Sequence, residues 1–172
     1  GLRERCILVD GFSKAYAMTG WRLGSGLLPT PLAPRFALLA LNDHACVPAF
    51  VQRAGIAALT GTQDPLNAMI REFAARRQLV SERLAAIPGV RIDAPAGAFY
   101  AFPNISDATR AAGITSAQLA TRLLHEYGVA LLPGTAFGAA GEGHLRLSFA
   151  TGRADLERAL TLVHECFTSL QS

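Results

Sequence analysis

One stretch of the chain combines an amine and a guanidinium on a run of small residues. Lys14 and Arg22 lie eight positions apart between Gly11 and Gly24, and Ser13 precedes the lysine. A lysine amine that is desolvated in a pocket loses its proton and attacks aldehydes. A guanidinium holds a phosphate through two parallel hydrogen bonds, and hydroxyls and loop amides add further donors. These groups together suit a small molecule that carries both an aldehyde and a phosphate.

A further cationic side chain, Arg146, lies far downstream in a segment that alternates apolar and polar residues over 144–150. This alternation predicts a strand with one buried face, and it puts Arg146 on the polar face. Most arginines on such faces are solvated, and so are most lysine and arginine pairs on loops. On residue type and spacing alone, solvated charge is therefore the default interpretation of Lys14, Arg22 and Arg146.

The elements that position these residues follow from the apolar pattern. We predict a buried strand over 6–9, then a loop with a helical turn, then a strand over 21–28 that ends at Pro29. Helical spacing follows over 34–41 and 47–59. A long helix begins at Asp64-Pro65 and continues to residue 87, where Pro88-Gly89 ends it.

Shorter elements follow this helix. The capping box formed by Thr115 and Gln118 opens a helix that Gly128 closes, and apolar spacing predicts a last helix near the C-terminus. Short strands are expected over 90–92, 98–102, 129–132 and 144–150. We therefore predict three parts: the C-terminal part of a larger α/β domain over 1–64, an interdomain helix over 65–87, and a small α+β domain over 88–172.

Composition limits the classes of function. The chain has 172 residues, of which 51% are hydrophobic and 17% charged, so it can bury a core and is not predicted to be disordered. The net charge of +3 comes from scattered arginines, and no basic run is interleaved with aromatic residues, so no nucleic-acid partner is predicted. No apolar run is long enough to predict a membrane span. The abrupt start at Gly1 leads us to expect that the chain is cut from a longer protein.

The cysteines indicate neither a disulfide framework nor a metal site. Cys6, Cys46 and Cys166 are odd in number, far apart and without CxxC spacing. Histidines lie close to two of them, but neither pair extends into a set of metal ligands. We interpret them as reduced thiols of a cytoplasmic protein and predict no metal.

The stretch Gly11-Phe12-Ser13-Lys14-Ala15-Tyr16-Ala17-Met18-Thr19-Gly20-Trp21-Arg22-Leu23-Gly24 resembles the pyridoxal-phosphate attachment signature of class I/II aminotransferases. It matches every constrained position of that signature. The resemblance implies that Lys14 is the lysine that binds pyridoxal 5'-phosphate as a Schiff base. It also implies that Arg22 binds the cofactor phosphate, to which Ser13 adds a further donor.

The resemblance covers essentially the whole chain. Residues 95–100, PAGAFY, look like the family's P-x-GAFY strand, and residues 128–138, GVALLPGTAFG, are similar to its GV-x-x-x-PG-x-x-FG segment. Residues 144–150, HLRLSFA, resemble its H-x-RLS-[FY]-A strand, whose arginine binds the substrate carboxylate. That role falls on Arg146. Phe99 is a candidate for lining the substrate pocket, although a place in the core is equally compatible with its type.

The resemblance implies a pyridoxal-phosphate-dependent transferase of fold type I, an α/β fold. The chain would hold the tail of the large domain and most of the small C-terminal domain. It implies transfer of an amino group between an amino acid and a 2-oxo acid, in a biosynthetic, cytoplasmic homodimer. The aspartate that pairs the pyridine nitrogen and the aromatic residue that stacks on the ring are expected upstream of Gly1. The isolated chain is therefore expected to be inactive.

Other functions are compatible with the same lysine. A lyase of this fold would carry out elimination or decarboxylation, although the stretch TGWRLG favours amino transfer over acyl condensation. An aminotransferase-like domain of a transcription regulator would keep the lysine beside a distant DNA-binding domain. One departure from the family lies at Cys46-Val47, where a serine directly before a proline is common, so no role is assigned there.

Overall fold

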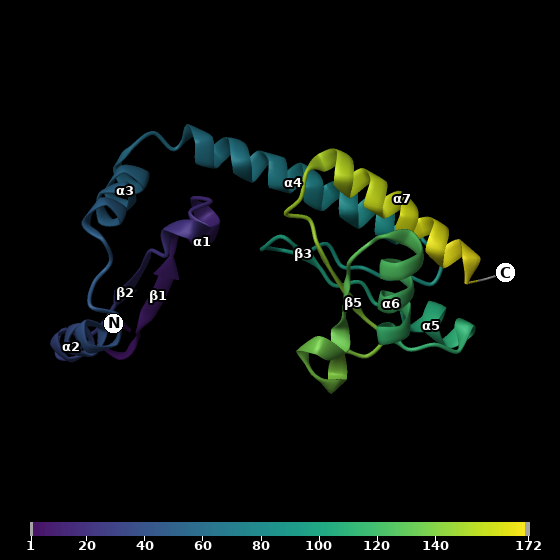
Figure 1. Ribbon diagram of the computed structural model, residues 1–172, viewed down its shortest axis with the longest axis horizontal. Helices are drawn as coiled ribbons and strands as arrows, with labels where there is room; N and C mark the ends of the chain where they lie inside the picture. Colours follow the sequence, from purple (N-terminus) through teal and green to yellow (C-terminus); the bar gives the residue numbers. More distant parts are fainter. Residues whose placement is uncertain (1, 171–172) are drawn as a thin grey trace. The chain divides into compact units, whose positions relative to one another are not determined.

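Residues 2–170 are described by a computed structural model, in which the chain forms two units, Gly1–Met69 and Ile70–Ser172 (Figure 1). Among the described residues, the first unit contains a two-stranded sheet, one short helix, two longer helices and the first residues of a fourth helix. The second contains a three-stranded sheet covered by helices. No helix among the described residues is long and apolar enough to cross a membrane.

The sheet of the first unit is an antiparallel pair. Strand β1 (Leu8–Gly11) pairs with β2 (Gly24–Leu27), so that Gly11 lies opposite Gly24. Helix α1 (Phe12–Ala15) and the 3₁₀ turn η2 (Thr19–Trp21) lie in the connection, as expected of a loop with a helical turn. A further 3₁₀ turn, η1 (Arg3–Arg5), precedes β1. Strand β2 begins later than expected because Arg22, after η2, is left-handed.

The prediction that residues 6–9 form a buried strand was wrong about burial. In β1 the side chains of Leu8 and Val9 are 58% and 74% exposed. Within the described residues of this unit, the strand pairs only with β2. An apolar run predicts that another element packs against the strand, but it does not show whether that element belongs to the same stretch of chain.

Two helices complete the first unit, near the positions that apolar spacing predicted. They are α2 (Ala33–His44), with Pro34 in its first turn, and α3 (Ala49–Thr60). The backbone N–H of Gly61 caps α3 by donating to the carbonyl of Ala57, at 2.9 Å. In α3, Val51 and Gly55 are buried within the unit.

Helix α4 (Asp64–Ala85) begins in the first unit and continues into the second. Its observed bounds agree with the predicted long helix to within two residues. Val80 and Leu84, near its C-terminal end, are buried in the core of the second unit. The assignment of this helix as an interdomain element stays a prediction.

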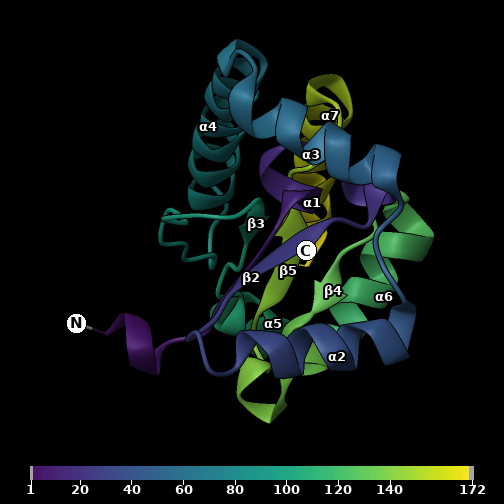
Figure 2. The ribbon, with the colours of Figure 1, turned by 90° about the vertical axis from the view of Figure 1, so that its left-hand side faces the viewer.

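Strand β5 (Leu145–Ser148) is the centre of the second sheet (Figure 2). It pairs antiparallel with β3 (Tyr100–Ala101) on one side and with β4 (Leu132–Pro133) on the other. The predicted alternation is confirmed, because Leu145, Leu147 and Phe149 are almost completely buried.

A strand over 90–92 was expected but does not form. The N–H of Val90 donates to Ile87 in a turn, which leaves a single bridge between Arg91 and Asn104.

Three helices pack in the second unit: α5 (Ser106–Ala112), α6 (Ser116–Tyr127) and α7 (Arg153–Ser169). The capping box predicted for α6 is present, and Gly128 ends that helix in the left-handed conformation. Helix α7 runs alongside the C-terminal part of α4 (Figure 1), where Arg83 donates to the hydroxyl of Thr161 at 2.8 Å. Helix α5 had no counterpart among the predicted elements.

A carboxylate from outside α6 also caps that helix. Glu142 accepts hydrogen bonds from the backbone N–H and the hydroxyl of Ser116, at 2.8 and 3.0 Å. The hydrogen bond from the Ser116 backbone is the main reason that the pKa of Glu142 lies below its ordinary value of 4.5, and partial desolvation opposes it. An anion is also favoured at this position because helix N-termini carry partial positive charge.

We predict that Glu142→Gln removes a pH-dependent part of the stability. A carboxyl group with a lowered folded pKa stabilises the fold above its unfolded pKa, and this contribution disappears as the pH falls through the folded pKa. Wild type should therefore unfold at a higher urea concentration than the variant at neutral pH, and the two should converge in acid. Urea titrations followed by circular dichroism from pH 7 to pH 3 measure this difference. Glu165→Gln, at an exposed position on α7, is the control and should show no such convergence.

Candidate active site

The connection between β1 and β2 is closed at its base. Besides the pairing of Gly11 with Gly24, the N–H of Phe12 donates to the carbonyl of Leu23 at 3.1 Å. Lys14 and Ser13 lie in α1 just inside one end of this closed loop, and Arg22 lies just inside the other end. The structure therefore places Ser13, Lys14 and Arg22 on one loop whose two ends are fixed to each other.

Lys14 is distinguished by composition as well as by position. The chain has 16 basic residues, and Lys14 is its single lysine, the others being arginines. Its side chain is exposed in this unit, in the short helix α1. The positive charge of this chain is thus supplied almost entirely by arginine. This composition weakens the interpretation of Lys14 as an ordinary solvated lysine. The scarcity of lysine is therefore a sequence signal that favours a specific role for Lys14.

Four non-glycine residues among those described have φ in the left-handed region, and the loop holds two of them, Ala17 at φ 53° and Arg22 at φ 52°. Residues with side chains enter this region at a cost, and such positions cluster at functional sites. The Arg22 side chain is exposed and donates one hydrogen bond, from Nη1 to the carbonyl of Thr19 at 3.1 Å. Its other N–H groups make no hydrogen bond within the described part of the chain, which leaves them available to an anion.

Close packing explains two glycines beside the loop. A Cβ at Gly24 would lie 3.1 Å from the carbonyl oxygen of Asp10 on the paired strand. A Cβ at Gly55, in α3, would lie 2.5 Å from the side chain of Leu23 and 3.7 Å from the ring of Phe12. The glycines thus let β2 and α3 approach the two ends of the loop.

An open pocket of about 570 Å³ adjoins the Arg22 side of the loop. Its walls are mainly apolar, and Arg22 is the charged residue among them. The lining residues are Ala17, Gly20, Trp21, Arg22, Pro48, Phe50 and Val51.

In the second unit, Arg146 lies on β5 between two aromatic side chains from other segments. The guanidinium carbon lies 4.6 Å from the ring centroid of Tyr100 and 4.7 Å from that of Phe137. Tyr100 comes from β3, and Phe137 comes from the 3₁₀ turn η3 (Gly134–Phe137) after β4. Both distances lie within the range of cation–π attraction, which extends to about 6 Å.

Arg146 differs from the other half-buried arginines of this unit. Arg76 and Arg122 are also half-buried, and they form ion pairs with Glu72 and Glu126 at 2.8 and 2.9 Å. The side chain of Arg146 makes no ion pair or hydrogen bond with any described residue, and its guanidinium lies against the two rings. A half-buried cation without an acidic partner is available to bind an anion, and the planar fork of arginine fits a carboxylate.

Phe99 belongs to the aromatic packing of the second unit. Its ring lies 6.0 Å from that of Phe73 in α4 and 4.6 Å from that of Tyr100. It packs, half-buried, against the hydrophobic core. This placement matches the core alternative considered for Phe99, and its candidacy for the substrate pocket stays a prediction.

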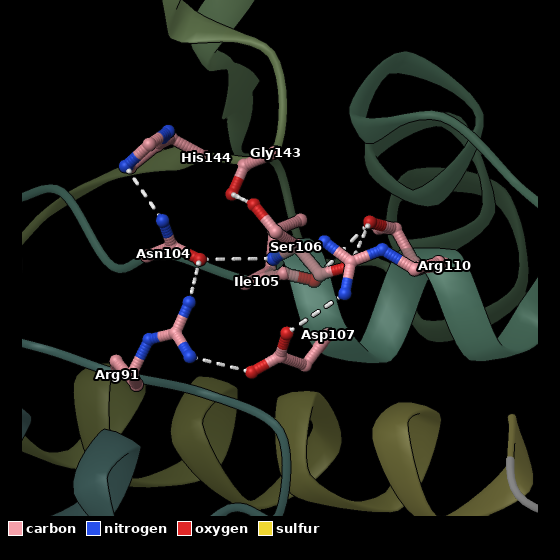
Figure 3. Close-up of polar contacts among 9 residues, drawn as sticks. Arg91, Asn104, Ile105, Ser106, Asp107, Arg110, Gly143 and His144 are labelled. Atoms are coloured by element: carbon pink, nitrogen blue, oxygen red, sulfur yellow. Dashed lines mark hydrogen bonds and ion pairs between the residues drawn. The ribbon is translucent and has the colours of Figure 1, made fainter.

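A polar network supports the start of β5 from the side of α5 (Figure 3). Asn104 Nδ2 lies 3.3 Å from His144 Nε2, and Asn104 Oδ1 accepts from the N–H of Ser106 at 3.1 Å. Asp107 pairs with Arg91 at 2.6 Å and with Arg110 at 3.3 Å. The network joins the segment before α5 to His144.

The loop that carries Phe137 depends on two glycines in backbone contact. A Cβ at Gly134 would lie 2.1 Å from the carbonyl oxygen of Gly141, and a Cβ at Gly141 would lie 2.0 Å from that of Gly134. These distances are too short for any side chain at either position. The glycine of the PG-x-x-FG segment is therefore required by the contact between η3 and the following turn η4 (Ala139–Gly141).

We predict that Gly134→Ala lowers the free energy of unfolding by about 1–3 kcal/mol, because the clash is with backbone that must shift. Gly97→Ala is the matched control, since its added Cβ would meet no atom within 4 Å. The control should change stability by less than about 0.5 kcal/mol. Equilibrium urea unfolding of both variants measures the difference, and equal stability would contradict this explanation of Gly134.

The cysteines and histidines do not form a second site. No group of three or more metal-binding side chains occurs among the described residues. Cys6 and Cys46 are exposed free thiols, and burial raises the pKa of the Cys166 thiol. His44 pairs with the neighbouring Asp43 at the end of α2, with both side chains exposed.

Two residues beside Arg146 were not among the predicted site residues. Tyr100 and Phe137 contact its guanidinium, and in the sequence they belong to the segments PAGAFY and GVALLPGTAFG. The available signal was that each segment carries an aromatic residue at or next to its end and accompanies the strand that carries Arg146. Sequence patterns alone do not show that three separate segments meet at one side chain.

Comparison with known proteins gives a consistent result. The family Aminotransferase class I and II matches residues 2–163. A putative aminotransferase of Bacillus subtilis is 41% identical over 93% of the chain and 40% of its own length. An aspartate aminotransferase of Pyrococcus horikoshii is 39% identical over 94% of the chain and 41% of its own length. The chain thus spans about 40% of the length of these curated relatives.

Solved structures agree in fold. An aromatic aminotransferase of Pyrococcus horikoshii matches with a TM-score of 0.89 and 38% identity, over 98% of this chain and 44% of its own. An aspartate aminotransferase of Rhizobium meliloti matches with a TM-score of 0.89 and 35% identity, over 97% of this chain and 43% of its own. The predicted fold class, part of a fold-type I transferase, is confirmed.

Proposed function

The chain belongs to the aminotransferase class I and II family, and from this premise we propose that the enzyme it forms part of transfers amino groups between amino acids and 2-oxo acids. The observation that carries the proposal is the closed loop that holds Lys14, the single lysine of the chain, together with Arg22. The family's attachment signature falls on this loop. Aspartate and aromatic amino acids are the first substrates to test, since relatives carry those names.

Pyridoxal 5'-phosphate is the cofactor that the family implies, and the residues of the loop fit it. Lys14 presents an exposed amine to an aldehyde, and Arg22 keeps N–H donors for a phosphate. Ser13 and the loop amides add neutral donors of the kind that phosphate sites use. When bound, the cofactor withdraws electrons from the carbon that bears the substrate amine, which weakens the bond from that carbon to its hydrogen.

Lys14 then has two tasks. Its amine would hold the cofactor through the aldehyde carbon. When that amine is free, it would take the proton from the substrate α-carbon and deliver it to the cofactor carbon that it had held. Such proton transfer by a positioned side chain contributes about 10²–10⁴-fold to a rate. The fixed ends of the loop limit the positions that this amine can reach.

Arg146 binds the substrate through its α-carboxylate. The half-buried position and the absence of an acidic partner among the described residues support this role. Every amino acid and every 2-oxo acid carries that carboxylate, so one arginine serves both halves of the exchange. A homodimer and a cytoplasmic location stay predictions.

The proposal is tested with the complete enzyme. The purified protein would be mixed with pyridoxal 5'-phosphate, 2-oxoglutarate and either aspartate or phenylalanine, and the new amino acid and oxo acid would be quantified by mass spectrometry. Equal amounts of glutamate and of the oxo acid of the donor are expected. Release of free ammonia without glutamate would instead establish the lyase alternative.

A further inference from the structure

We propose that Tyr100 and Phe137 are positioning residues that fix the Arg146 guanidinium for a carboxylate, an inference that rests on the proposed function. Their rings lie 4.6 and 4.7 Å from its central carbon. They attract the positive charge without accepting its N–H groups in hydrogen bonds. The donors of Arg146 therefore stay available while the cation itself is held.

Each of the two rings is in turn supported by another aromatic side chain. The ring of Phe99 lies 4.6 Å from that of Tyr100, and Phe99 packs against the core of the unit. The ring of Phe102 lies 6.2 Å from that of Phe137, edge to face at 81°. The clamp formed by Tyr100 and Phe137 is thus built from packed rings rather than from two isolated side chains, although Phe137 itself is 53% exposed.

Phe102 is supported by His144, which lies directly before β5 and two residues before Arg146. The two rings are stacked at 5.0 Å with an angle of 10° between their planes. His144 Nδ1 lies 3.2 Å from the carbonyl of Glu142, which can only accept, and its Nε2 lies 3.3 Å from the Asn104 amide nitrogen, which can only donate. These partners specify the tautomer with the proton on Nδ1 and fix the plane of the ring.

The functional consequence is pre-organisation. A free arginine side chain loses rotamer entropy when it is held in one orientation. If the rings already restrict the side chain, this loss of entropy does not oppose the binding of a carboxylate. Removal of one ring should therefore weaken carboxylate binding, while cofactor attachment at Lys14 stays unchanged.

The experiment compares carboxylate binding by the complete, cofactor-loaded enzyme and its variants. Succinate and 3-phenylpropanoate, the amine-free counterparts of aspartate and phenylalanine, are the probes, and calorimetry gives their dissociation constants. Tyr100→Leu and Phe137→Leu should each weaken binding about twofold to tenfold, the range for one cation–π contact. Tyr100→Phe keeps the ring and should bind like wild type.

A shape-conserving substitution separates positioning from folding. Phe137→pentafluorophenylalanine keeps the ring in place but reverses its quadrupole, so it should weaken probe binding without changing the melting temperature. The KM for the amino acid should rise in that variant with little change in kcat. A structural role alone would predict no change in either binding or KM for this variant.

The outcomes distinguish the two proposals. In one outcome, the wild-type enzyme binds a probe and the ring-removing and fluorinated variants bind it equally well. That result would overturn the clamp and leave the proposed function intact. Wild-type enzyme that binds neither probe would overturn the carboxylate role of Arg146 and the clamp with it. An enzyme that binds a probe but transfers no amino group would contradict the proposed function alone, and the variants would still test the clamp.

Discussion

Lys14→Ala is expected to abolish amino transfer by the complete enzyme. The variant loses the amine that holds the cofactor and the base that moves the substrate proton. Loss of the base alone predicts a fall of about 10²–10⁴-fold in kcat. Single-turnover mixing with an amino acid, followed through the visible absorption of the bound cofactor, measures the rate of proton transfer.

Two further observations would make this result specific. Added methylamine should restore part of the rate in Lys14→Ala, because a free amine can take the proton that Lys14 normally takes. Circular dichroism should show an unchanged fold, since the Lys14 side chain is exposed in its unit. If Lys14→Ala kept kcat within tenfold of wild type, Lys14 would not be the catalytic lysine.

Arg146→Lys is expected to lower kcat/KM for amino acids about 10²–10³-fold, although the charge is kept. A lysine ammonium offers point-like donors instead of the planar fork that matches both oxygens of a carboxylate. It also loses the extended contact with the rings of Tyr100 and Phe137. Truncation of one partner of a charged, hydrogen-bonded pair costs about 2–5 kcal/mol, or roughly 30-fold to 5,000-fold, which includes this range.

Arg158→Lys provides a matched control on the same unit. Arg158 is exposed on α7 and makes no ion pair or hydrogen bond with the described residues. Its variant should keep kcat/KM within about twofold of wild type. Steady-state kinetics on both variants, with an amino acid and separately with a 2-oxo acid, should show the Arg146 effect in both directions. An effect on the amino acid alone would argue against a carboxylate contact.

Much of the second unit was predictable from the sequence, because local signals there agree with tertiary packing. The capping box of Thr115 and Gln118 opens α6 as expected, and alternation over 144–150 identified the buried face of β5. The position of Arg146 on the other face followed from the same alternation. Local hydrogen-bond chemistry and side-chain period are properties of short segments, so they are visible in sequence.

Other features depend on contacts between distant segments. The strand over 90–92 failed because a turn at Val90 uses an N–H that a longer ladder would need. Burial of β1 could not be predicted, since it depends on which elements cover the strand. The clamp around Arg146 depends on contacts between residues of β3, β5 and η3, and no short sequence pattern predicts contacts between three separate segments.

The most direct measurement locates the cofactor on the chain. Holoenzyme is reduced with sodium borohydride, which converts the bond between the cofactor aldehyde carbon and a lysine amine into a stable one, and is then digested with trypsin. Because trypsin does not cleave at a modified lysine, the predicted product is a single peptide, residues 6–22, that carries the phosphopyridoxyl group on Lys14. Unmodified peptides 6–14 and 15–22, with the group on a lysine elsewhere in the enzyme, would contradict the assignment of Lys14.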